Sequence, residues 1–206
     1  MTLLGESEAR EGFISAEALE SIARHLTPDM AVAVKMLFAL AWRKSEVLGL
    51  QWSEVGLETG AVHLAADRCK DGRKRDGYLD PATLALLVQH RARVTAWEKQ
   101  TGVITPYVFP GPVAGQPVQD FVKSWRTATK RSGYAGTLVH DLRRSAIKDM
   151  IKSGTPEKVC MQASGHATRH VFERYHVVND QDLRDAVARR AQFRHIQPSN
   201  VVALAR

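Results

Sequence analysis

The sequence predicts a mainly α-helical domain (α+β) with one small antiparallel β-sheet. Apolar residues recur at helical spacing along most of the 206 residues, and one short segment combines two strand-like stretches with an Asp-Gly turn signal. Hydrophobic residues make up 44% of the chain, which is enough for a packed core, and the length suits a single domain.

The N-terminal part predicts a lead-in and two helices. Residues 1–12 are polar and rich in Gly and Glu, which predicts a loose lead-in. In residues 14–26 the apolar positions step by four, and Ser15 is a suitable N-cap. Residues 31–42 are nearly all apolar and predict a buried helix that is too short to span a membrane and that runs into residues 43–50.

A β-hairpin is predicted next, and the rest of the chain is mostly helical. Residues 61–65 and 77–79 predict two strands, and the basic segment KDGRKR (70–75) between them contains the turn signal. Pro81 marks the start of a helix that continues to Gly102. The region with four prolines, residues 105–118, predicts a loop. Further helices are predicted at residues 118–133, 141–154, 155–165, 169–177 and 180–193.

Charge and cysteine content narrow the possible classes of protein. The formal net charge of +7 favours polyanionic partners, although scattered lysines that serve solubility would give the same total. Cys69 and Cys160 lie far apart and lack metal-ligand spacing, so we expect neither a disulfide framework nor a metal site. No apolar run reaches transmembrane length, and no signal-peptide pattern is visible, so we expect a soluble, cytoplasmic protein that contacts no membrane.

Two clusters of candidate residues lie in the first half of the chain. Arg43 and Glu46 are three positions apart on one helix face, where they would form at least an ion pair. Lys70 is followed by a strongly basic turn, which suits a DNA groove but is also common on solvated surfaces. The basic residues of this turn are Arg73, Lys74 and Arg75.

A third cluster is the segment HDLRRS, residues 140–145, at a predicted helix start. The helix dipole disfavours cations there, so a bound anion would explain them. His140 and Arg143 can both point toward one phosphate beside free backbone N–H groups. We expect Asp141 to cap the helix and Leu142 to face the core.

A fourth cluster, SGHATRHVFERYHV at residues 164–177, contains His166 and Tyr175. A tyrosine in a helix usually belongs to a core, and nothing in its immediate neighbourhood marks Tyr175 as a nucleophile. The chain contains no Gly-rich phosphate loop, which argues against nucleotide hydrolysis, and no Ser or Cys nucleophile elbow.

The order of these motifs resembles that of the catalytic domain of the tyrosine recombinases, the phage integrase family. WRKSEVLGLQWSEV is similar to the family's first arginine motif, CKDGR to its hairpin lysine, HDLRR to its second box, SGH to its third box, and FERY to its tyrosine motif. The common order is far more specific than any single motif. The resemblance covers residues 13–190 and implies the tyrosine-recombinase catalytic fold over residues 13–195, followed by a tail at 196–206.

The resemblance implies a metal-independent and cofactor-independent enzyme that breaks and rejoins DNA strands. Arg43 and Arg143 would clamp the non-bridging oxygens of the scissile phosphate, and Glu46 would support Arg43. Fixed guanidiniums stabilise the negative charge that develops on these oxygens. Four further residues are expected to contact DNA, namely Arg73, Lys74, Arg75 and Arg144.

The resemblance assigns the nucleophilic attack and the proton transfers to four other residues. Tyr175 would attack phosphorus and form a 3′-phosphotyrosyl link, and Lys70 would protonate the leaving 5′ oxygen. His140 and His166 would contact the phosphate and assist proton transfer. A phenol with a pKa near ~10 is a poor nucleophile at pH 7, so the tyrosine needs a neighbouring base or a positive field.

The chain departs from the family pattern in three respects. Trp42 replaces the usual glycine before the first arginine, and Ser164 replaces the leucine of Leu-Gly-His. We expect both changes to be tolerated because neither touches a catalytic side chain. The chain also has no room for the N-terminal domain that clamps the other face of the DNA, so it resembles a catalytic-domain fragment or a minimal version.

The expected function is that of a site-specific recombinase, an integrase of a phage or other mobile element. The expected partner is a double-stranded recombination site, on which the protein would assemble as a tetramer through its C-terminal helix. Alternatives within the enzyme class are a chromosome-resolving or inverting recombinase and a type IB topoisomerase. A non-catalytic DNA-binding relic is the alternative from another class, and a basic helical interaction domain would leave the ordered motifs unexplained.

Overall fold

The computed structural model of the protein describes residues 13–69, 72–169, 172 and 180–196. These residues form a mainly helical structure with a two-stranded antiparallel sheet, so the predicted fold class is confirmed. No helix in these ranges is long and apolar enough to cross a membrane. The main elements are α1 (Ala16–Ala23), α2 (Pro28–Leu40), α3 (Lys44–Leu48), β1 (Ala61–Leu64), β2 (Arg75–Tyr78), α4 (Pro81–Thr101), α5 (Val122–Arg131), α6 (Val139–Lys152), α7 (Glu157–Ser164) and α9 (Asp180–Ile196).

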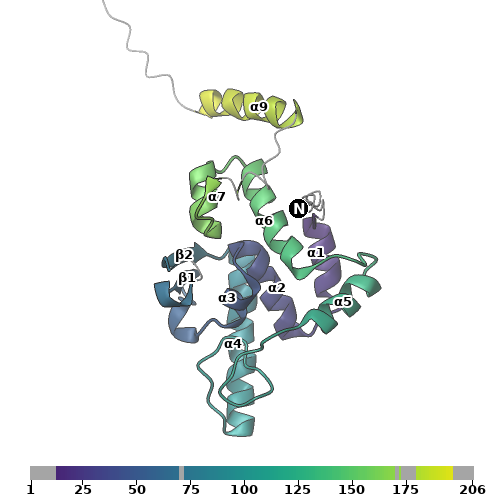
Figure 1. Cartoon of the computed structure of the whole chain (residues 1–206), viewed down its shortest axis with the longest axis vertical. Helices are drawn as coiled ribbons and strands as arrows, with labels where there is room; N and C mark the ends of the chain where they lie inside the picture. The colour runs from purple at the N-terminus through teal and green to yellow at the C-terminus, as the bar shows by residue number, and fades with distance from the viewer. Residues whose placement is uncertain (1–12, 70–71, 170–171, 173–179, 197–206) are drawn as a thin grey trace, which may run out of the picture.

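Helix α2 lies at the centre of the molecule, in contact with α1, α3, α4, α6 and β2 (Figure 1). Neighbours on several sides explain why its sequence is almost continuously apolar rather than amphipathic. Its residues Ala33, Val34 and Met36 are fully buried. Pro28 is the first residue of α2. Proline suits the first helical position because an N–H group there would have no intrahelical partner.

The predicted continuation of this helix into residues 43–50 is wrong. Helix α2 ends at Leu40, and Ala41 adopts a left-handed conformation with φ 53° before α3 begins at Lys44. Non-glycine residues rarely adopt this conformation, so the surroundings must hold it. Ala41 is fully buried, and its carbonyl accepts a hydrogen bond from the Arg143 side chain. The break makes Arg43 the N-cap residue of α3.

The predicted hairpin is confirmed, with β1 antiparallel to β2 and Leu64 opposite Arg75. The returning strand begins at Arg75, two residues earlier than expected, so Arg75 belongs to the strand and not to the turn. Gly77 packs against Leu40 and Trp42, because a Cβ atom added at Gly77 would lie 2.6 Å from Cδ2 of Leu40 and 3.0 Å from the indole ring. The absent side chain of Gly77 therefore makes room for both residues.

The C-terminal half completes the helical body. Helices α5, α6 and α7 lie within or near the predicted segments, and residues 105–118 form a loop as predicted. Most of the predicted helix at 169–177 lies outside the described residues. Helix α9 lies beyond α6 and α7 in Figure 1, and Arg189 on it donates a hydrogen bond to the carbonyl of Lys152 at 3.0 Å.

Candidate active site

The Glu46 carboxylate organises the first arginine motif. It accepts a hydrogen bond from the backbone N–H of Arg43 at 2.8 Å and pairs with the Arg43 guanidinium at 2.7 Å. This confirms the predicted ion pair and stabilises the start of α3 in the manner of a capping box. The Glu46 side chain is only 4% exposed, whereas that of Arg43 is 33% exposed. Arg43 is therefore held by a buried anchor while part of it remains accessible.

Arg75 is the second partner of Glu46, and its predicted position on an exposed basic turn is wrong. Its side chain is 3% exposed and lies 2.9 Å from Glu46 in an ion pair. The Arg75 guanidinium carbon lies over the Trp42 ring, 5.9 Å from the ring centroid. Any side chain at Gly165 would collide with its guanidinium. Because β2 begins at this arginine, strand alternation turns it toward the carboxylate and away from solvent. Its burial removes it from the surface where a direct DNA contact was expected.

The other predicted DNA-binding residues remain near the surface. Arg73 and Lys74 are exposed at the hairpin, next to the undescribed residues 70–71. Arg144 is partly exposed and lies 4.0 Å from Asp141 in an ion pair. The basic character of this surface is thus carried by fewer side chains than the sequence predicted.

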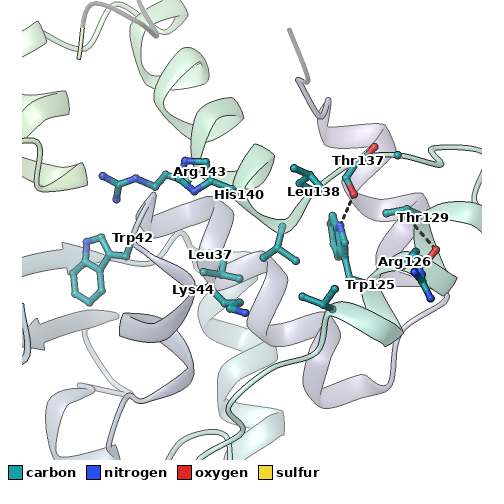
Figure 2. Close-up of a pocket in the computed structure, with 13 residues that line it drawn as sticks. Leu37, Trp42, Lys44, Trp125, Arg126, Thr129, Thr137, Leu138, His140 and Arg143 are labelled. Atoms are coloured by element: carbon teal, nitrogen blue, oxygen red, sulfur yellow. Dashed lines mark hydrogen bonds between the residues drawn. The ribbon is translucent and has the colours of Figure 1, made fainter. Parts of the chain in front are cut away.

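The second box forms the first turns of α6. The Asp141 carboxylate accepts a hydrogen bond from the backbone N–H of Leu138 at 2.8 Å, so the predicted capping is confirmed. Leu142 is fully buried, as expected. His140 is exposed at the helix start, whereas Arg143, one turn later, is buried (Figure 2). The helix start therefore carries both predicted phosphate ligands, at different depths.

Arg143 joins three distant parts of the chain. Its Nη1 donates hydrogen bonds to the carbonyl of Ala41 and, at 2.8 Å, to the carbonyl of Ser164. Its Nη2 lies 3.2 Å from Nε2 and 3.5 Å from Nδ1 of His166. Fixed backbone acceptors hold this guanidinium in place before any ligand arrives, as electrostatic preorganisation requires.

Both histidines of the site have lowered pKa values. Burial, followed by the positive charges of Arg143 and Arg43, lowers the pKa of His166 to about 4. His140 is exposed but part of its ring is shielded, and this partial loss of hydration, followed by the charges of Arg143 and Arg144, lowers its pKa from the ordinary value. The histidines are therefore mainly neutral at pH 7 and have a lone pair that can accept a proton.

The site thus brings together four of the six predicted catalytic residues. Three separate segments supply them, and each lies close enough to the others to affect their ionisation. They are Arg43, His140, Arg143 and His166. Lys70 and Tyr175 lie outside the described residues. Within the described ranges, no group of three or more His, Cys, Asp or Glu side chains could hold a metal ion.

An apolar cavity of about 460 Å³ adjoins the charged cluster, between α2, α5 and the start of α6 (Figure 2). Leu37, Trp125 and Leu138 are among its lining residues, together with His140 and Arg143. The Trp125 indole N–H donates a hydrogen bond to the Thr137 carbonyl at 2.9 Å. An apolar wall beside the cations lowers the local polarity, which strengthens their attraction for an anion.

Sequence reasoning missed two residues of the site, Trp42 and Ser164. The fully buried Trp42 donates a hydrogen bond from its indole N–H to the Ala163 carbonyl at 2.9 Å, and its ring packs on Arg75. The Ser164 hydroxyl lies 2.7 Å from Nδ1 of His166. The expectation that neither residue touches a predicted catalytic side chain is therefore wrong for Ser164. Both residues depart from the family pattern and lie next to motif residues. That departure could have identified them as site residues from the sequence.

Comparison with known proteins places the chain in a family. Residues 13–182 match the sequence profile of the phage integrase family. The chain belongs to this family. The shufflon-specific DNA recombinase of Escherichia coli is 29% identical over 136 residues, which are 66% of this chain and 31% of that protein. The integrase of Salmonella phage P22 is 21% identical over 145 residues, 69% of this chain and 37% of that protein. The matched part thus spans about a third of each relative.

Solved structures of integrases and recombinases share the fold. The catalytic domain of bacteriophage HP1 integrase matches with a TM-score of 0.60 and 17% identity, over 95% of this chain and 100% of that domain. XerA recombinase matches with a TM-score of 0.68 and 18% identity, over 87% of this chain and 65% of that one. The Tn1549 transposon integrase matches with a TM-score of 0.70 and 15% identity, over 91% and 68%. The predicted catalytic-domain fold is thereby confirmed.

The buried ion pair of Arg75 yields a stability prediction. Arg75→Met should lower the free energy of unfolding by about 3 kcal/mol, because it removes a buried charge and leaves Glu46 with one guanidinium. Urea unfolding of the full chain, followed by circular dichroism, measures the change. Arg73→Met on the same hairpin is the matched control and should stay within about 0.5 kcal/mol of the unmodified protein. Equal losses in the two variants would contradict the assigned ion pair.

Proposed function

We propose that the protein is a site-specific DNA recombinase of the integrase type, which cleaves and rejoins DNA through a 3′-phosphotyrosyl intermediate. The convergence of Arg43, His140, Arg143 and His166 carries this proposal. Two guanidiniums and two neutral imidazoles in one place suit a phosphodiester, which needs charge stabilisation and proton transfer together.

The two arginines would stabilise the transition state. In-line attack places negative charge on the equatorial oxygens of phosphorus, and guanidiniums bind such oxygens through paired hydrogen bonds. Arg143 is held by backbone carbonyls and Arg43 by Glu46, so neither must reorganise when the charge develops. Removal of one preorganised donor typically costs about 10²–10³ in rate. The guanidiniums would supply the positive charge that a metal ion supplies elsewhere.

Proton transfers would accompany the attack. The bond between the Tyr175 oxygen and phosphorus forms while the bond from phosphorus to the 5′ oxygen breaks. The phenol proton passes to a neighbouring neutral histidine, and Lys70 gives a proton to the leaving 5′ oxygen. The lowered pKa values of His140 and His166 leave both rings neutral at pH 7, which a proton acceptor requires. Rejoining reverses these steps, and no cofactor is required.

The proposed partner is a double-stranded recombination site, on which a tetramer would assemble in the cytoplasm, at the nucleoid. The Tn1549 integrase was solved in complex with transposon right end DNA, and XerH recombinase was solved bound to its difH substrate. In this chain, α9 exposes Leu183, Val187 and Phe193, at 60%, 70% and 63%. A short helix with exposed apolar residues favours docking on another surface. Residues 13–195 would form the catalytic domain, flanked by a lead-in at 1–12 and a tail at 196–206.

The nucleophile can be tested on DNA duplexes that have been selected for binding to the protein and that carry a nick near the cleavage position. Tyr175→Phe should abolish the covalent protein–DNA adduct on a denaturing gel and leave DNA affinity within about twofold, because only the attacking oxygen is lost. Tyr134→Phe is the matched control and should form the adduct normally. An adduct that persists without the Tyr175 hydroxyl would show that another residue attacks. A mobility shift without any adduct in the unmodified protein would favour a DNA-binding relic.

The exposed basic turn should contribute to binding through phosphate contacts. Affinity should fall steeply with salt, and Lys74→Gln should reduce the slope of log K against log salt concentration by about 1. Fluorescence anisotropy at several salt concentrations measures this slope. Lys99→Gln, near the far end of α4, should leave the slope unchanged. A salt-independent affinity would rule out a phosphate-driven interface.

The exposed apolar residues Leu183 and Val187 of α9 should act in assembly more than in binding of one half-site. Replacement of Leu183 and Val187 by glutamine should weaken the paired-site complex at least several-fold more than the half-site complex, because it removes apolar contact area. Native gels with one and two half-sites measure both. Arg184→Gln with Ala188→Gln, on the same helix, is the control. Unchanged assembly after the apolar replacement would exclude α9 as a coupling element.

A further inference from the structure

Ser164 is the last residue of α7, and it contacts both Arg143 and His166. The family pattern has leucine at this position. The Ser164 carbonyl accepts a hydrogen bond from Arg143 at 2.8 Å, and its hydroxyl lies 2.7 Å from Nδ1 of His166. The serine is fully buried. We propose that Ser164 is a positioning residue that fixes the tautomer of His166, with the hydrogen on Nδ1 and the lone pair on Nε2.

The hydroxyl of Ser164 determines which nitrogen carries the hydrogen. A serine hydroxyl has one hydrogen and two lone pairs. The oxygen lies 2.6 Å from the Cys160 carbonyl and 3.4 Å from the Met161 carbonyl, and both groups can only accept. The hydroxyl therefore donates its single hydrogen to a backbone carbonyl of α7, and its oxygen is the acceptor in the contact with His166. Nδ1 must then be the donor in the 2.7 Å contact.

Arg143 holds the face of the same ring. Its Nη2 lies 3.2 Å from Nε2 and 3.5 Å from Nδ1 of His166, so the guanidinium lies over the imidazole and not in its plane. A cation in this position favours a neutral ring of either tautomer. Arg143 therefore fixes where the ring lies, and the Ser164 hydroxyl determines which nitrogen carries the hydrogen.

The ring is also held against rotation. Phe172 packs its edge on His166 with ring centroids 6.0 Å apart, and Gly165, with φ 72°, lets the chain turn sharply from α7 to the histidine. A 180° turn of the ring would bring a carbon to the Ser164 hydroxyl and break the 2.7 Å hydrogen bond. A leucine at position 164 would keep the carbonyl contact to Arg143 but leave Nδ1 without this acceptor.

The consequence for the reaction rests on the proposed function. A neutral His166 with its lone pair on Nε2 can accept a proton at that nitrogen and cannot donate one from it. The charged and titratable groups that act on it are Arg143, Arg43, Arg75 and His140, and together with burial they keep it neutral at pH 7. Ser164 would thus set His166 as a proton acceptor for the first step of strand cleavage.

The tautomer can be measured directly in the full chain without DNA. The nitrogen-15 shifts of the His166 ring at pH 7, assigned by comparison with His166→Gln, should show a protonated Nδ1 and an unprotonated Nε2. Ser164→Ala should move both shifts toward each other as the two tautomers mix. Ser153→Ala is the matched control, because its hydroxyl also bonds a helix carbonyl, at 2.7 Å, away from the site. Unchanged His166 shifts in Ser164→Ala would overturn the proposal.

Cleavage kinetics test the positioning role separately. Ser164→Ala should slow adduct formation about tenfold, as expected for loss of a residue that orients a functional histidine, with DNA affinity within about twofold. A normal rate with mixed tautomers would overturn the positioning role. If the unmodified protein forms no adduct, the proposed function fails, while the nitrogen-15 shifts still decide the tautomer.

Discussion

Burial of the Arg143 guanidinium is the constraint on which the site depends. An arginine cannot lose its charge, and a buried charge is very costly unless hydrogen bonds satisfy it. Two carbonyls meet this need, one at the end of α2 and one at the end of α7. The left-handed Ala41 and the α7 terminus at Ser164 both place a carbonyl where Arg143 can reach it. The helix ends are therefore part of the site.

Excess positive charge is the second property of the site. Glu46 pairs with both Arg43 and Arg75, so one carboxylate serves two guanidiniums, and both of these lie near enough to His166 to lower its pKa. Neutral histidines limit the repulsion, since protonation would add two further charges. Binding of an anion would relieve the mutual repulsion of these cations, so the cluster favours anionic ligands.

Local pattern predicted the helices and the hairpin, because helical period and turn signals lie within short stretches. The grouping of the motif residues was expected only from their order along the chain, which resembles that of the family. Local pattern failed where tertiary contacts decide. The helix break at Ala41 has no glycine or proline to mark it and depends on a carbonyl bond to Arg143. Arg75 looks like a solvated turn residue until the Glu46 carboxylate is found beside it. The role of Ser164 depends on its contact with the His166 ring, two residues further along the chain.

The contact between Trp42 and Gly77 has a consequence for how such chains diverge. Interiors are close-packed, so the volume at this contact must be filled from one side or the other. Here the large residue precedes the first arginine and the strand contributes no side chain at all. In a relative with glycine before that arginine, a bulkier residue on the strand would fill the same space once the end of the Leu40 side chain also moves aside. The two positions should therefore covary in size, and a substitution at one would be accepted only after compensation at the other.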